Sequence, residues 1–237
     1  MNRQRPAILT VIMPATLMAG AAIAIAYAIT THAPQRGAAP AALADQTSAL
    51  THTVALPLVM RLPSAVACSN IAQNGDFEAP LPGHPWTGVA NTSIVYVDTF
   101  ISRDHAHSGA QSGRVGSLSR NSVWNEMLQT VQMPAGVVSA TLTYWRYLDT
   151  TETSLTTVYD LFTAGIETEQ GIQIAVPQQI DNTSAGRATW VQGRIDLPNA
   201  VNWSGRRLWL SFKAATDSNL PSSLYIDDVS FVVCATP

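Results

Sequence analysis

The chain has 237 residues, and only 12% of them are charged, about half the usual share for a soluble domain. Its net charge at pH 7 is -3, and Lys213 is its only lysine. Because a nucleic-acid partner normally requires a basic patch, this composition argues against nucleic-acid binding.

The N-terminus has the order of parts that is typical of an export signal. Arg3 and Arg5 supply positive charge, residues 7–29 form an uncharged apolar run, and residues 26–28 offer a small-x-small cleavage motif. The run is also long enough to span a bilayer of about 30 Å as an uncleaved anchor. Residues 1–29 are therefore predicted to be a signal peptide or a signal anchor. The protein is predicted to be secreted or extracellular, with no membrane contact other than this segment.

Residues 30–67 are rich in Ala, Pro and Thr, which is typical of a linker. An apolar stretch at residues 54–60 either adds an edge strand or packs on the following domain. Pro57 and Pro63 weigh against a central strand there.

From residue 68 to residue 237, short apolar and β-branched runs alternate with clusters of Gly, Pro, Asn, Asp and Ser. This pattern is typical of an all-β domain. Strands are predicted at residues 70–78, 93–101, 112–118, 126–133, 140–148, 156–163, 171–176, 189–197, 207–214 and 223–233. A sheet of so many strands must fold over on itself. The predicted architecture is therefore a two-sheet antiparallel β-sandwich, or jelly roll.

Two of these segments alternate strictly between two faces, as strands with one face on a core do. The first puts Ala140, Leu142, Tyr144 and Arg146 opposite Thr141, Thr143, Trp145 and Tyr147, and the second puts Leu208, Leu210, Phe212 and Ala214 opposite Arg207, Trp209, Ser211 and Lys213. The rows rich in aliphatic residues are predicted to face the core.

Cys68 and Cys234 lie just before and just after the patterned region. In an oxidising compartment they are predicted to form a disulfide that ties the two ends of the domain together. A metal or redox pair is the competing interpretation, but the sequence has no CxxC spacing to support it.

Several motifs occur in an order that resembles a known superfamily. They are Asn-Gly-Asp-Phe-Glu at 74–78 followed by Trp86, His-Ser-Gly at 107–109, the strand at 128–135, and the closing segments 190–197, 208–212 and 224–231. Together they resemble the galactose-binding-like and family 4/9-type carbohydrate-binding jelly-roll modules, a group that includes MAM-like domains. Similar endings occur in modules attached to secreted bacterial hydrolases, including metallopeptidases of the immune inhibitor type. The resemblance implies a jelly roll, whereas its members differ in function.

The resemblance also implies a structural calcium site, because the first and last strands of such modules lie side by side and often share an ion. Calcium prefers six to eight oxygen ligands. The implied ligands here are Glu78 and Asp228, with the turn residues Ser108, Gly109 and Ser112 and a further oxygen from Asp76. The alternative is that Glu78 caps a turn and Asp228 accepts hydrogen bonds from backbone amides, with no ion.

No catalytic constellation is evident in the sequence, so the chain is predicted not to be an enzyme. Asp227 and Asp228 are expected on opposite faces of a strand, with Asp227 toward solvent or a loop, and are therefore not a catalytic pair. His105 and His107 lie in a turn-rich segment without further His or Cys nearby, which favours a structural role.

Trp145, Tyr147 and Trp209 are predicted to face away from the core and to form a platform for sugar rings, since exposed apolar surface usually marks an interaction site. The alternative is that the faces are inverted and these rings fill the core. The predicted function is a non-catalytic binding module for a glycan or cell-surface polymer. The rival hypothesis is a structural or protein-contact domain of the cell envelope with no sugar ligand.

Overall fold

The computed structural model describes residues 65–80, 84–90, 93–95 and 100–237, all of which belong to the unit Val59–Pro237. The predicted signal segment, the linker up to residue 64 and part of the predicted strand at 93–101 lie outside the described residues. Within the described ranges, no helix is long and apolar enough to cross a membrane.

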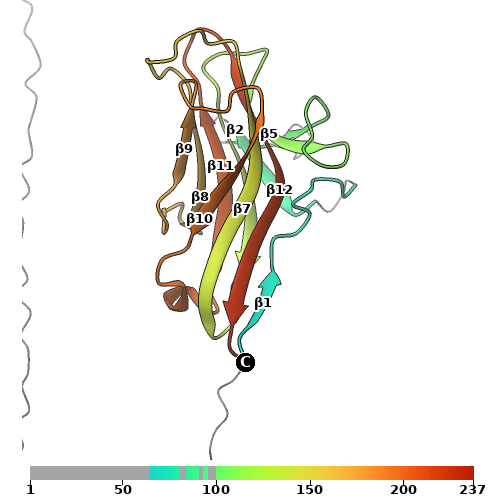
Figure 1. The fold of residues 1–237 in the computed structure, drawn as a ribbon, viewed down its shortest axis with the longest axis vertical. Coiled ribbons are helices and arrows are strands. Elements are labelled where there is room, and N and C mark those ends of the chain that lie inside the picture. Colours follow the sequence, from blue (N-terminus) through green and yellow to red (C-terminus); the bar gives the residue numbers. More distant parts are fainter. Residues whose placement is uncertain (1–64, 81–83, 91–92, 96–99) are drawn as a thin grey trace, which may run out of the picture. The chain divides into compact units, whose positions relative to one another are not determined.

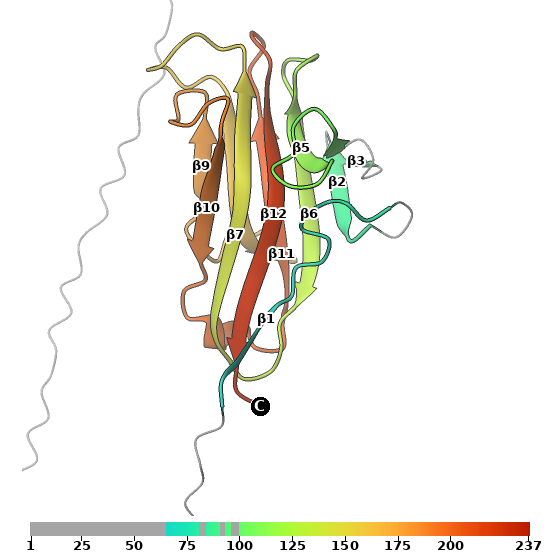
Figure 2. The same ribbon diagram turned by 45° about the vertical axis from the view of Figure 1, so that its right-hand side comes forward.

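Two antiparallel sheets form the fold, which confirms the predicted all-β sandwich (Figures 1 and 2). The first sheet has the order β10-β7-β12-β5-β4, and β1 also pairs with β12. Its long central strands β7 and β12 run side by side in both views. The strands of this sheet are β1 (Ala67–Asn70), β4 (Ile101–Ser102), β5 (Ser112–Ser117), β7 (Val137–Thr150), β10 (Trp190–Asp196) and β12 (Ser222–Ala235).

The second sheet has the order β3-β2-β6-β11-β8-β9. Its strands are β2 (Trp86–Ala90), β3 (Ser93–Val95), β6 (Trp124–Gln132), β8 (Leu161–Thr168), β9 (Gln178–Asp181) and β11 (Arg207–Ala215). A short 3-10 helix, η2 (Ala200–Trp203), connects β10 of the first sheet to β11 of the second.

The core lies between the sheets and is filled by the rows that the alternation predicted. Tyr144 of β7 and Phe212 of β11 are fully buried, and their rings meet edge to face at 5.1 Å between centroids. Arg146 of β7 also points inward, where burial lowers the pKa of its guanidinium.

Two predicted strands are wrong, and the strand predicted at 156–163 is displaced, since β8 begins only at Leu161. The strand predicted at 70–78 ends at Asn70, because Asn74 and Phe77 adopt left-handed φ angles of 46° and 58° that turn the chain and bury Phe77. Residues 171–176 form a loop with only an isolated bridge at Gln173, and the strand β9 follows it. Ile172 and Val176 in this segment are 61% and 87% exposed, whereas Ile174 and Ala175 pack on the core, so the segment buries two adjacent side chains and lacks the alternation of a strand.

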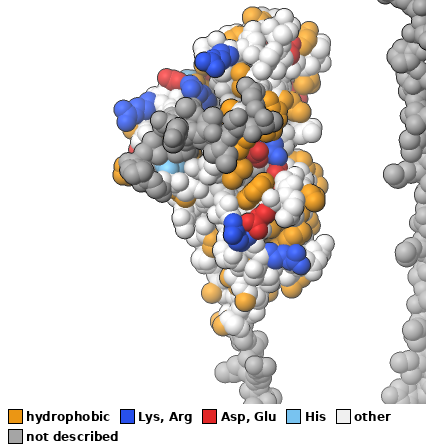
Figure 3. Space-filling model, turned by 180° about the vertical axis from the view of Figure 1, so that it is seen from behind, with side chains coloured by type: hydrophobic (Ala, Val, Ile, Leu, Met, Phe, Trp, Pro, Cys, Tyr) orange, Lys and Arg blue, Asp and Glu red, His pale blue; other side chains and the backbone are white. Residues whose placement is uncertain are grey.

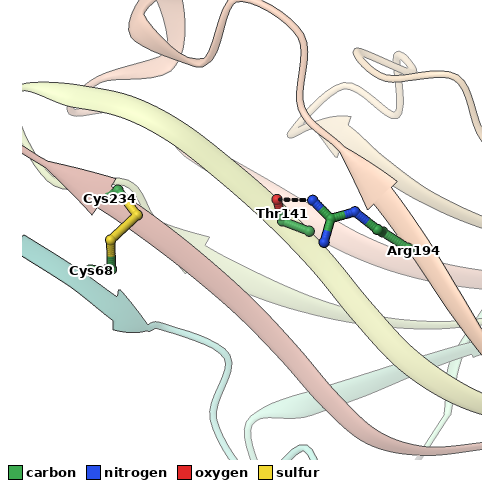
Figure 4. Close-up of a disulfide and its surroundings, with 4 residues drawn as sticks. All are labelled: Cys68, Thr141, Arg194 and Cys234. Carbon is green, nitrogen blue, oxygen red and sulfur yellow. Dashed lines mark hydrogen bonds between the residues drawn. A yellow bond between two sulfur atoms is a disulfide. The ribbon is translucent and has the colours of Figure 1, made fainter.

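The predicted disulfide is present between Cys68 and Cys234 (Figure 4). The two residues are directly opposite each other on β1 and β12 and are 166 positions apart in the sequence. The bond therefore ties the entry strand of the domain to its last strand.

Candidate functional site

Four large aromatic rings lie on the outer face of the first sheet, and one of them, Tyr225 of β12 opposite Tyr147, is fully buried. The other three keep part of their surface exposed. Trp145 and Tyr147 come from β7, and Trp190 begins β10 directly opposite Tyr147. All three side chains are half-buried, and the ring centroids of Tyr147 and Trp190 are 5.6 Å apart. We call Trp145, Tyr147 and Trp190 the aromatic face.

Two histidines from the segment 103–111, between β4 and β5, pack against the aromatic face. The ring of His107 stacks on Trp145 at 4.1 Å between centroids with 15° between the planes, and its edge meets Trp190 at 5.4 Å. The ring of His105 stacks on Tyr147 at 4.2 Å. The histidines therefore hold the rings of the aromatic face from one side.

Two carboxylates of β12 anchor this segment. Asp227 is fully buried, and its Oδ2 accepts hydrogen bonds from the backbone N–H of His107 at 2.7 Å and of Ser108 at 3.0 Å. Asp228 accepts from Nδ1 of His107 and from Oγ of Ser108, each at 2.6 Å. Burial raises the pKa of Asp227 to about 6, although the N–H groups that it accepts from oppose the rise.

The expected separation of these two acids onto opposite faces is wrong. A register shift between Asp227 and Ser230 marks a bulge in β12, and Asp228 has a left-handed φ of 47°. Because the bulge interrupts the alternation of the strand, Asp227 and Asp228 both contact the same turn.

The residues implied for calcium surround this turn from two sides. Oε1 of Glu78 accepts from the backbone N–H of Ala110 and Gln111, both at 2.7 Å, and packs against Gly109. Those N–H dipoles already direct positive charge at this oxygen, which disfavours adding a cation there.

The other implied ligands are also hydrogen-bonded: Oδ1 of Asp76 accepts from the N–H of Glu78 at 3.4 Å, and Oγ of Ser112 donates to the carbonyl of His105. In the part of the chain that the structure describes, no three His, Cys, Asp or Glu side chains are arranged to hold a metal ion. Calcium at Glu78 and Asp228 stays a prediction, and the effect of EDTA on the melting temperature tests it.

A polar strip continues from the aromatic face along the same outer surface. Arg194 of β10 donates to Oδ1 of Asp196 at 2.6 Å and to Oγ1 of Thr141 on β7 at 3.4 Å (Figure 4). The hydrogen bonds from Arg194 and Thr141 lower the pKa of Asp196. Gln192, opposite Trp145, lies between this strip and the aromatic face.

The predicted single platform of Trp145, Tyr147 and Trp209 is wrong. Trp209 belongs to β11 in the second sheet and faces outward on the other side of the sandwich. Trp190 takes the third place on the aromatic face instead. The sequence carries a signal for it, an aromatic residue at the second position of the strand predicted at 189–197, but the register that places it beside Tyr147 depends on long-range pairing.

No protein-family model matches the sequence, and no curated protein matches it. Solved structures with a similar fold include carbohydrate-binding modules. TmCBM61 in complex with β-1,4-galactotriose is 15% identical, with a TM-score of 0.46, over 69% of this chain and 97% of that chain. The CBM22-1 xylan-binding domain of Paenibacillus barcinonensis Xyn10C is 14% identical, with a TM-score of 0.40, over 73% and 100%.

A Stig cyclase from Fischerella sp. TAU is 11% identical, with a TM-score of 0.45, over 72% of this chain and 100% of that chain. These neighbours therefore combine sugar-binding modules with an enzyme. At such identities and TM-scores, the similarities carry no argument about what this chain binds.

Proposed function

We propose that this protein is an exported, non-catalytic module that binds a glycan on the outer face of its first sheet. The observation that carries the proposal is the group of three half-buried rings, Trp145, Tyr147 and Trp190, on a solvent-facing sheet surface. Large aromatic side chains at a protein surface commonly mark a binding site, because they combine an apolar body with a polar edge.

The surroundings of the aromatic face suit a sugar chain. The C–H faces of a sugar ring stack on an indole, while its hydroxyls need both donors and acceptors. Gln192, Arg194 and Asp196 supply such groups along β10, beside the rings. The histidine stacks and the anchored turn keep the rings in place before a ligand arrives, which reduces the entropy lost on binding.

The experiment is a glycan array probed with the oxidised protein, followed by titration of each glycan that is retained. Replacing Trp145 or Trp190 by alanine is expected to weaken binding by about ten- to hundredfold, as the loss of an aromatic anchor commonly does. Trp209→Ala is the matched control on the opposite sheet and is expected to leave binding unchanged. Equal losses from all three variants, or no retained glycan, would contradict the proposal.

A second candidate function, a protein-contact domain, has its own supporting observation. Leu155 and Val158, between β7 and β8, are 70% and 52% exposed, and Leu220, between β11 and β12, is 42% exposed. The two loops are joined by a hydrogen bond from the N–H of Thr151 to the carbonyl of Pro221 at 3.2 Å. Capture of one envelope protein that is lost with Leu155→Ser and unaffected by Trp145→Ala would favour this candidate.

A further inference from the structure

A small pocket lies on the second sheet, apart from the aromatic face. Its volume is about 290 Å³, and its lining comes from the end of β8 with the two residues that follow it, from the end of η2 and from the start of β11. The lining residues are Thr168, Glu169, Gln170, Trp203, Arg206 and Arg207. We call this the Trp203 pocket. Figure 3 shows basic, acidic and hydrophobic side chains close together on this side of the molecule.

The backbone around the Trp203 pocket is held firmly. Trp203 packs on the core, and its carbonyl accepts from the N–H of Arg206 at 3.1 Å. The N–H of Gly205 donates to the carbonyl of Pro134 at 2.9 Å, and Nε2 of Gln132 donates to the carbonyl of Gly205 at 3.0 Å. The indole and the neighbouring arginine are therefore presented from a fixed turn.

The two arginines of the pocket differ in their partners. Arg207 is paired with Oε1 of Glu169 at 2.7 Å, so its charge is neutralised. The guanidinium of Arg206 lies 5.8 Å from the centre of the Trp203 ring, and no carboxylate among the described residues forms an ion pair with it. Arg206 thus supplies an uncompensated positive charge beside an aromatic ring.

We propose that the Trp203 pocket binds one carboxylated sugar unit, a hexuronate, of an acidic polysaccharide. A guanidinium and a carboxylate form paired, charge-assisted hydrogen bonds, and an indole accepts the apolar face of a sugar ring. Glu169 and Gln170 on the rim supply acceptors and a donor for hydroxyl groups. The volume is slightly below the range of about 300–1,000 Å³ for drug-sized ligands, which fits a single unit. This site does not depend on the aromatic face.

The test is calorimetric titration of the full chain with tri-galacturonate and with the methyl ester of the same trisaccharide. The acid is expected to bind, and the ester, which lacks the negative charges, is expected to bind at least about tenfold more weakly. Arg206→Gln is expected to weaken binding of the acid by about tenfold or more. Arg120→Gln, the same charge change on an exposed loop, is the matched control and is expected to have no effect.

Trp145→Ala separates this site from the proposed function, because it is expected to leave tri-galacturonate binding unchanged. Arg206 is exposed, so Arg206→Gln is expected to fold, and its melting temperature checks this. The proposal is overturned if tri-galacturonate does not bind, if the ester binds equally well, or if Arg206→Gln has no effect. The proposal would also be overturned if sodium sulfate displaced tri-galacturonate completely while sodium chloride at the same ionic strength did not. The pocket would then recognise a small anion alone.

Discussion

At the scale of single residues, Lys213 lies on the outer face of the second sheet between two carboxylates. Its Nζ is 2.6 Å from Oε1 of Glu167 and 3.4 Å from Oε1 of Glu126. Glu167 is fully buried and also accepts from Oγ of Ser211 at 2.8 Å. Burial raises the pKa of Glu126 despite the Lys213 charge. Burial alone would lower the pKa of Lys213, but the two acids raise it.

Lys213→Met is predicted to destabilise the domain by about 3 kcal/mol, because it leaves the buried Glu167 carboxylate without a cation. Adding Glu167→Gln to that variant removes the stranded charge and is expected to recover most of the loss. Urea unfolding at pH 7 measures both changes. A cost below about 1 kcal/mol for Lys213→Met would mean that the pair behaves like an exposed one.

The residues of the candidate site differ in how far the sequence predicts them. Trp145 and Tyr147 follow from the alternation of one strand, which fixes the face on which each side chain lies. His107 and Trp190 reach the same place from other segments, through pairing between positions distant in the sequence. Alternation within one segment carries no information about such pairing. For the same reason it does not show that the strands of Trp145 and Trp209 belong to different sheets.

At the scale of elements, the bulge in β12 determines where the segment 103–111 lies. Asp227 supplies the acceptor for two consecutive backbone N–H groups, those of His107 and Ser108. Without this carboxylate both N–H groups would have to find water, since the turn has no strand partner for them.

Asp227→Ala is therefore predicted to speed amide hydrogen exchange at His107 and Ser108 by at least about tenfold, the effect of losing roughly 1.4 kcal/mol of local protection. The amides of β11, such as Leu210, are the internal reference and are expected to exchange as before. Unchanged protection at His107 and Ser108 would show that the aromatic stacks alone hold the turn.

The elements themselves were predictable where apolar residues alternate over a long strand, as in β7 and β11. Prediction failed where a short apolar run is only partly buried, as at 171–176, or where a turn with left-handed residues follows a strand, as after Asn70. The strand β2 was missed because Trp86–Ala90 is short and contains Gly88, which lies against the ring of Phe100.

At the scale of the whole molecule, the disulfide closes almost the entire domain. Reduction is predicted to lower the free energy of unfolding by about 5 kcal/mol, the chain-entropy value for a loop of this length. Thermal melts with and without dithiothreitol measure the loss. The double variant Cys68→Ser/Cys234→Ser is the control, and dithiothreitol is expected to leave its melting temperature unchanged. Equal melting temperatures for the oxidised and reduced protein would contradict the stabilising role of the bond.

Binding of a glycan to the aromatic face is the central claim, and the indole N–H signals of the six tryptophans test it most directly. The measurement is a nitrogen–proton correlation spectrum of the labelled protein, titrated with a neutral glycan retained on the array and assigned with single Trp→Phe variants. The signals of Trp145 and Trp190 are predicted to shift with a common saturation curve, while those of Trp124 and Trp209 stay in place. Shifts confined to Trp124 or Trp209, with Trp145 and Trp190 unmoved at saturation, would contradict the claim.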